Sequence, residues 1–224
     1  MTEHIRTKKS FWRFQLKAMG FIAIFIGPVV LFAAMLIHGL PFPRSISETA
    51  TITNRTDSIL PFCLGALALF ALTYAIVYAH DRMDRIFTAG MFGGFTVVAM
   101  QMCASPYIQV QRVGFMGVSP TVSNILHSTG AVCGFGSMIL WVMLCFTKSD
   151  KMKNMQTQEK RLRDACYFWL GALMLFSLII FVFNFIGLLG ENFPVVFAAE
   201  CLMLTFGGIA CLIKGGFVLR DKHE

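Results

Sequence analysis

The sequence of 224 residues has few charged side chains and no long polar segment. Only 14% of its residues are Asp, Glu, Lys or Arg, whereas 56% are hydrophobic, and the mean hydropathy is +0.68. The charges form short clusters between long apolar runs, which is typical of a membrane protein with several spans and excludes a sizeable soluble domain. The net charge of +7 lies in these flanks, where it indicates topology signals and contacts with lipid headgroups, so we expect no nucleic-acid partner.

Motifs that would hold a metal or a disulfide framework are also lacking. The seven cysteines contain no CxxC pair, and they lie within or at the ends of apolar runs. Cysteines in such positions behave as small hydrophobic residues, so we expect no disulfide framework, no metal site and no cofactor. The sequence shows no convincing internal repeat, which disfavours a transporter built from inverted repeats.

The sequence contains long uncharged runs. A transmembrane helix needs about 20 apolar residues, and six segments satisfy this requirement. They predict an all-α protein, a single domain over residues 1–224, folded as a bundle of six transmembrane helices. The predicted helices cover about 19–40, 59–80, 86–108, 121–147, 165–189 and 193–219. Residues 1–18 are basic and rich in aromatic side chains, which predicts an amphipathic lead-in, and Pro28 predicts a kink in the first helix.

The distribution of basic residues predicts the orientation of the bundle. All but three of the 19 Lys and Arg residues fall on one side of the predicted bundle, and the three on the other side are Arg44, Arg55 and Arg112. Basic residues are enriched on the cytoplasmic side of membrane proteins. We therefore expect both termini in the cytoplasm, most simply at the plasma membrane, or at an endomembrane if the cell is eukaryotic.

The stretch 121–147 is the predicted centre of the bundle. It carries no charge, and small or polar residues recur along it at helical spacing: Ser123, His127, Gly130, Gly134 and Ser137. Small residues allow transmembrane helices to approach closely. We therefore expect Gly130 and Gly134 to lie in a close helix contact.

Polar residues in the predicted spans gather in the outer half of the bilayer, whereas the inner half has almost none. At about 1.5 Å per residue, His127 and Glu200 each lie roughly 8–10 Å inside the outer boundary. Gln101 and Asn184 fall at a similar depth, and His38 lies nearer the boundary. A carboxylate and an imidazole are costly to leave alone in a membrane, so we expect His127 and Glu200 to lie within reach of one another.

The first outer loop would cover this polar layer. Pro41 and Pro43 end the first predicted helix, and Ser45, Ser47 and Glu48 follow them. Arg112, in the second outer loop, would join this group. Solvated loop residues are the alternative interpretation of the same side chains.

Three functions fit this arrangement. The first is a protein that binds or remodels a lipid of the outer leaflet. If it is an enzyme, His127 would be the general base, oriented by Glu200, with Ser45 or Ser47 as the nucleophile and Glu48 nearby. Binding without catalysis is the simpler interpretation. The second function is a non-enzymatic scaffold or regulator that binds a lipid or a protein. The third is a small transporter, which the apolar inner half disfavours.

Three motifs together resemble the DRAM/Frag/Sfk family of six-helix membrane proteins. They are the run from Pro41 to Thr49, the sequence His-Ser-Thr-Gly-Ala that begins at His127, and the sequence Ala-Ala-Glu that ends at Glu200. Members of that family are tied to autophagy, to lipid remodelling of GPI anchors and to lipid organisation at the plasma membrane. The resemblance therefore implies a six-helix fold and membrane lipids as partners.

Overall fold

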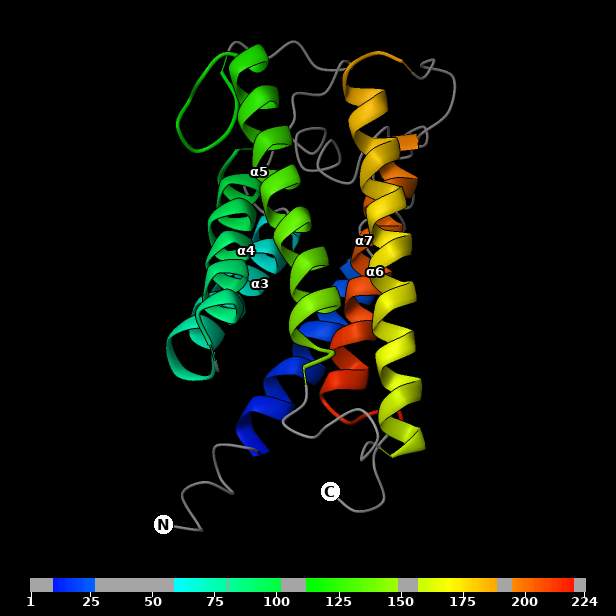
Figure 1. Cartoon of the computed structure of the whole chain (residues 1–224). Coiled ribbons are helices and arrows are strands. Elements are labelled where there is room, and N and C mark those ends of the chain that lie inside the picture. The colour runs from blue at the N-terminus through cyan, green and yellow to red at the C-terminus, as the bar shows by residue number, and fades with distance from the viewer. Residues whose placement is uncertain are drawn as a thin grey trace.

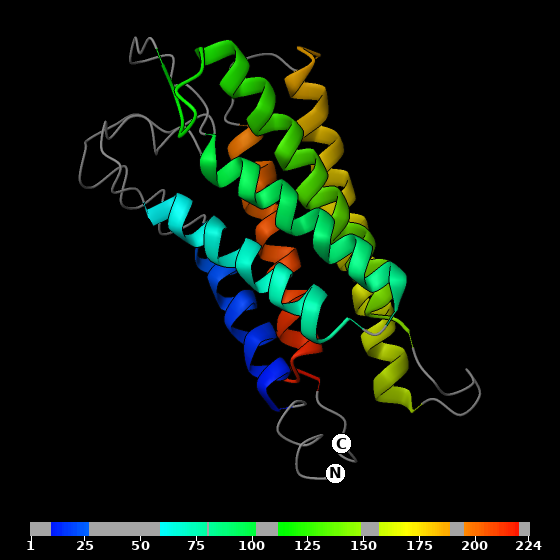
Figure 2. The same cartoon turned by 90° about the vertical axis from the view of Figure 1, so that its left-hand side faces the viewer.

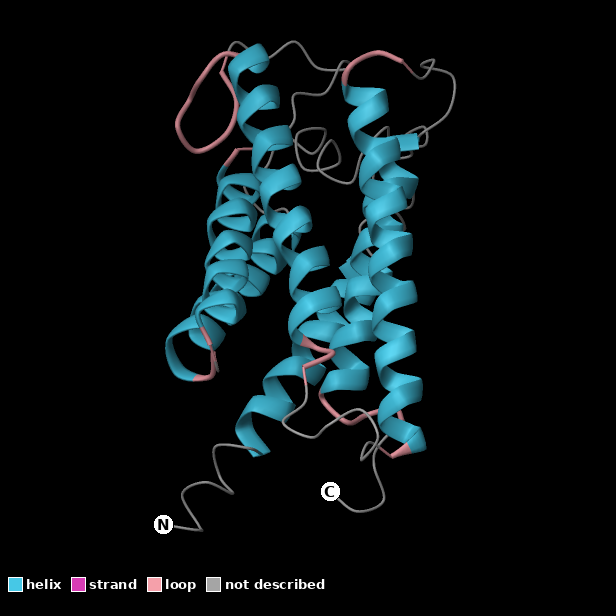
Figure 3. Cartoon of the chain, in the orientation of Figure 1, coloured by secondary structure: helices cyan, strands magenta, loops and turns pink. Residues whose placement is uncertain are grey.

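The computed structural model describes residues 10–26, 59–79, 81–101, 112–148, 157–188 and 195–219. These residues are almost entirely helical (Figure 3). The helices are residues 10–26, α3 (Ile59–Val77), α4 (Arg82–Met100), α5 (Pro120–Leu140), α6 (Gln158–Phe185) and α7 (Val195–Lys214). A short π-helix, η1 (Trp141–Cys145), continues α5. Each of the six predicted segments thus contains a helix.

The helix ends differ from the predicted ones in both directions. Some helices extend beyond their apolar run into polar residues, and one ends earlier than predicted. Residues 10–18 are already helical, so part of the predicted lead-in belongs to the first helix. α6 begins at Gln158 and not at 165, because the Thr157 side chain accepts a hydrogen bond from the Lys160 backbone and caps the helix. α4 ends at Met100 and not at 108. The predicted kink at Pro28 lies outside the described residues.

Three of these helices are long and apolar enough to cross a membrane: α5 with η1 (Pro120–Cys145), α6 and α7. α3 contains a shorter apolar stretch, Phe62–Val77. Many large apolar side chains of these helices point outward, including Leu144, Phe176 and Leu202. An apolar exterior over spanning helices is what a lipid environment requires, so the fold is that of a helical membrane protein.

Two groups of helices make up the bundle, and α5 belongs to both. α4 packs between α3 and α5, and α6 packs along α7. α5 also contacts α6 and, over a shorter stretch, α7 (Figures 1 and 2). The helix of residues 10–26 lies beside α7, where the Phe21 and Phe217 rings stack edge to face. The central position predicted for the 121–147 helix is therefore confirmed.

Glycines bring α4 and α5 into direct backbone contact. A Cβ atom on Gly94 would lie 2.5 Å from the Gly134 Cα atom and 2.7 Å from the Gly130 carbonyl oxygen. A Cβ atom on Gly130 would lie 3.0 Å from the Gly94 carbonyl oxygen. The predicted close contact of Gly130 and Gly134 is confirmed, and its partner is Gly94.

The contacts of α7 are of two kinds. A Cβ atom on Gly208 would lie 2.7 Å from the Gly20 carbonyl oxygen, so α7 meets the first helix through backbone. Towards α5 and α6, Gly207 faces the ends of two long side chains, Met138 and Met174. At Gly207 the neighbours are therefore flexible thioether side chains and not backbone.

Basic side chains gather at one end of the bundle, as predicted. Lys148 pairs with Asp81, and the Lys214 ammonium donates to the Phe146 carbonyl. The Lys17 side chain lies against Gly215 at the end of α7. The first turn of α4, the Arg13–Lys17 part of the 10–26 helix and the last turn of α7 thus lie at the same end of the bundle.

Candidate functional site

The polar residues of the opposite end meet around Gln101. α4 ends at Met100, and Gln101 follows it in extended conformation with its side chain buried. The Ser123 hydroxyl donates to Gln101 Oε1 at 3.4 Å, and His127 Nδ1 lies 2.5 Å from the Gln101 carbonyl oxygen. All three residues are at most 2% exposed. We call Gln101, Ser123 and His127 the glutamine cluster.

His127 acts as a cap for the end of α4. The last carbonyl groups of a helix have no partner within that helix, and a histidine side chain can hydrogen-bond to them. Because a carbonyl oxygen only accepts, Nδ1 carries the hydrogen of this bond, and in a neutral ring the lone pair then lies on Nε2. His127 therefore has a structural role that the sequence analysis did not foresee.

A short loop closes over the glutamine cluster. Val113 and Val118 pair in an antiparallel bridge, and the Phe115 backbone donates to the Met100 carbonyl at 2.8 Å. Gly114 lies directly on Gln101, with φ of +73°, and a Cβ atom there would be 3.0 Å from Gln101 Cδ and nearer still to Oε1. Both the positive φ and the close approach require glycine at this position.

One hydrogen-bond donor of the glutamine cluster has no acceptor among the described residues. Gln101 Nε2 is buried and has no hydrogen-bond partner within the described part of the chain. A buried amide donor left without a partner costs about 1–3 kcal/mol. Most buried polar groups in native proteins are satisfied, so an exception calls for a physical explanation, such as a bound ligand or water.

Glu200 lies on the buried face of α7 and is 6% exposed. It shares that face with Gly207, Gly208 and Cys211, as the helical spacing predicted. Glu200 and the His127 imidazole lie within electrostatic range of each other. A direct or bridged contact between His127 and Glu200 stays a prediction.

The remaining predicted site residues have varied positions. Asn184 is half-buried near the end of α6, and Arg112 is exposed in the loop before α5. His38, Ser45, Ser47 and Glu48 lie outside the described residues. The proposed catalytic combination of His127 with a loop serine therefore stays a prediction.

A second buried polar cluster lies at the basic end of the bundle, and it corrects the expectation of an apolar inner half. The Asp84 side chain is 4% exposed and accepts hydrogen bonds from Trp141 Nε1 at 2.5 Å and from the Tyr74 hydroxyl at 3.3 Å. Thr88 is buried one turn further along α4. We call Asp84, Tyr74 and Trp141 the aspartate cluster.

Sequence reasoning missed Asp84 because it stands between Arg82 and Arg85, where it resembles an ordinary flanking charge. The helical spacing of α4 carried the necessary signal. Asp84 falls on the buried stripe of that helix, which continues through Thr88, Met91, Phe95 and Val98. An acid on a buried stripe requires hydrogen-bond donors from neighbouring helices.

Lysine side chains cap the carboxyl end of α5 and η1, much as His127 caps the carboxyl end of α4. The Lys214 ammonium donates to the Phe146 carbonyl at 3.0 Å and lies 5.2 Å from the centre of the Phe146 ring. Lys160 donates to the Thr147 carbonyl at 3.3 Å and pairs with Asp164. Cations are favoured at helix carboxyl ends, so these lysines stabilise the junction of α5, α6 and α7.

An exposed ion pair joins the start of α4 to the residues that follow η1. The Lys148 ammonium donates to the Asp81 carboxylate, and the same aspartate caps α4 through the Asp84 backbone. The hydrogen bond from Lys148 lowers the pKa of the Asp81 carboxyl below its ordinary value, and it raises the pKa of the Lys148 ammonium. Asp81 is therefore held in its charged form.

No family model, no curated protein and no solved structure matches the chain. The resemblance to the DRAM/Frag/Sfk family stays a prediction from its three motifs.

Proposed function

We propose that the protein is an integral membrane protein that binds the polar part of a membrane lipid next to the glutamine cluster. The observation that carries this proposal is the buried Gln101 Nε2 donor, which has no partner among the described residues. A lipid ester, phosphate or hydroxyl oxygen is an acceptor that would satisfy it. The imidazole of His127 lies next to Gln101, and Glu200 acts on that imidazole, so the ligand group would meet a polar environment.

The proposal includes six transmembrane helices, with both termini in the cytoplasm and the glutamine cluster in the outer half of the bilayer. It is supported by the gathering of basic residues at the end opposite this cluster. Labelling of intact cells with an impermeant thiol reagent tests the orientation. Thr53→Cys should be labelled and Asn154→Cys should not; both positions lie outside the described residues. The reverse pattern would contradict the orientation.

Lipid binding is favoured over transport by what lies between the two polar clusters. Met91 and Phe95 lie between Asp84 and Gln101 on the buried stripe of α4, and both are fully buried. The described residues therefore place an apolar layer between the two ends, where a transport path would need polar groups. A scaffold role that uses the same lipid site is compatible with this arrangement, and we propose binding without catalysis.

The substitution Gln101→Met separates a ligand site from a packing defect. Methionine has a similar length and is apolar, so it removes the unsatisfied donor. If the donor is only a defect, the variant will respond to lipid like the parent, whatever the loss of the Gln101 Oε1 acceptor for Ser123 does to its stability. If the donor binds lipid, the variant will lose the thermal stabilisation that added lipid gives the parent protein. We expect the second result.

A matched control is Ser177→Ala. Ser177 is also buried, but its hydroxyl already bonds to the Leu173 carbonyl at 2.9 Å. The control should respond to lipid like the parent. An equal loss of the lipid response in both variants would show that the effect is not specific to Gln101.

The coupling of His127 and Glu200 is tested by a double-mutant cycle. Removing one member leaves the other buried and less well paired, at a cost of about 1–3 kcal/mol. His127→Ala and Glu200→Ala should each lower the free energy of unfolding, and the double variant should lose less than the sum. Additive losses would show that the two groups do not form one site.

A further inference from the structure

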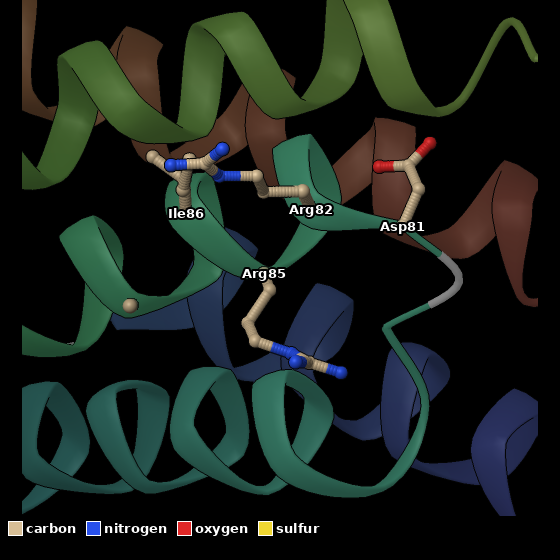
Figure 4. A pocket seen from close by; sticks show the side chains of 5 residues that line it. Asp81, Arg82, Arg85 and Ile86 are labelled. Carbon is tan, nitrogen blue, oxygen red and sulfur yellow. The ribbon is translucent and has the colours of Figure 1, made fainter.

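A hollow at the basic end of the bundle is distinct from both buried clusters. It is formed by the first two turns of α4 and is lined by Asp81, Arg82, Arg85, Ile86 and Ala89 (Figure 4). The Arg82 side chain lies along α4 and reaches Ile86, one turn further on, and the Arg85 side chain extends towards α3. Cationic donors are thus supplied in two directions around the same hollow.

The charge of this hollow is not neutralised by the acids beside it. Asp81 is paired with Lys148, and Asp84 points inward to Trp141. Within the described part of the chain, neither Arg82 nor Arg85 makes an ion pair. Among the described residues, two guanidinium groups therefore remain for an anionic ligand, and a guanidinium binds phosphate oxygens in a bidentate manner.

The exposed face of α4 continues from the hollow as an apolar strip. Ile86 is 49% exposed and Val97 is 36% exposed, and Ala89 and Gly93 lie between them on the same face. No atom lies within 4 Å of the place that a Cβ atom on Gly93 would occupy, so the apolar strip is indented at this point. A ligand that fits both parts has an anionic head and an apolar chain, which is the chemistry of an anionic phospholipid.

We propose that Arg82 and Arg85 bind the phosphate of an anionic phospholipid, with one acyl chain along Ile86, Ala89 and Gly93. The lipid belongs to the leaflet at the basic end of the bundle, so this site and the glutamine cluster are at opposite ends of the bundle. The two arginines position the headgroup, and the apolar strip distinguishes a lipid from a free phosphate.

Native mass spectrometry of the full chain in detergent tests this proposal, with phosphatidylglycerol titrated against phosphatidylcholine. The parent should bind phosphatidylglycerol more tightly. Arg82→Gln with Arg85→Gln should weaken its binding by about tenfold or more, because each cationic side chain near a lipid surface contributes substantially to the attraction. The control, Lys17→Gln with Arg161→Gln, removes the same charge at the same end and should change binding by about twofold or less.

Two results would overturn the proposal. An equal loss in both double variants would mean that binding depends on net charge and not on this hollow. Displacement of the lipid by glycerol 3-phosphate at equal concentration would mean that a soluble phosphate is the ligand. Ile86→Gln, which leaves both arginines in place, should weaken lipid binding without affecting the soluble phosphate. The arginine substitutions should cause the same loss of binding in the parent and in a Gln101→Met background, so failure here and failure of the proposed outer site are distinguishable.

Discussion

The glycine contact between α4 and α5 allows a sharp test, because two adjacent glycines of α4 have opposite surroundings. Gly94 faces the backbone of α5, whereas Gly93 is exposed and has nothing within 4 Å of the place that a Cβ atom would occupy. Alanine adds the same methyl group at both positions. It also gives both the same gain in helix propensity, about 0.5–1 kcal/mol. The difference between the two variants therefore isolates the interhelical contact.

The expected size of that difference follows from the distances. The new methyl group of Gly94→Ala would lie 2.5 Å from the Gly134 Cα atom and nearer still to its nitrogen. Unstrained contacts between such atoms are about 3.5 Å, so the two helix backbones must separate by roughly 1 Å. Overpacking of this kind costs about 1–3 kcal/mol. Gly94→Ala should be less stable than Gly93→Ala by about that amount.

Thermal unfolding in detergent, followed by tryptophan fluorescence, measures the difference. For a protein of this size, about 1–3 kcal/mol corresponds to a Tm lower by roughly 2–12 °C. Gly136→Ala on α5 is a second control, because the space around Gly136 is also open. Equal melting temperatures for Gly93→Ala and Gly94→Ala would refute the backbone contact, and so would a higher one for Gly94→Ala.

The basic end of the bundle supplies three more predictions. Trp141→Phe removes the donor to the buried Asp84 carboxylate and should lower the free energy of unfolding by about 1–3 kcal/mol; an unchanged value would show that the bond contributes nothing. Lys214→Met keeps the apolar stem but loses the bond to the end of η1, so denaturant titration should show a similar loss, and Lys214→Arg should recover part of it. Asp81→Asn keeps the helix cap but loses the ion pair with Lys148. Because the pKa of Asp81 is lowered and that of Lys148 is raised, the parent should have the higher Tm between their ordinary values of 3.8 and 10.5. That advantage should vanish as the pH falls through the lowered pKa of Asp81, and a constant difference down to pH ~2 would contradict the assignment.

Hydropathy predicted where the helices lie, because an apolar run long enough to span a membrane has few other structures available. It did not predict where they end. Hydropathy indicates which residues lie in the hydrocarbon layer of a membrane, and a helix can extend beyond that layer. Thr157, for example, caps α6 well before its apolar run begins. The contact of Gly130 and Gly134 was predictable because small residues at helical spacing favour close packing.

The details of the site were less predictable, because they depend on contacts between distant segments. Gln101 was expected to be polar and buried, and it is. That His127 would bond to its backbone depended on where α4 ends, which hydropathy does not report. Asp84 was missed because its neighbours in sequence are charged, whereas its neighbours in space are Trp141 and Tyr74.

The two buried clusters have a mechanical consequence, since each joins α4 to α5. Trp141 bonds to Asp84 in the first turn of α4, His127 bonds to Gln101 directly after its last residue, and backbone contacts at Gly94 occupy the middle. A helix fixed at both ends and in its centre can neither slide nor rotate against its neighbour, so α4 and α5 would move as one rigid body. α7 meets Met138 of α5 and Met174 of α6 at Gly207, and these thioether side chains can adapt to new neighbours. A shift of α6 and α7 against the α4–α5 pair should therefore occur at this methionine contact, while the lysine bonds to the Phe146 and Thr147 carbonyls hold the basic end together.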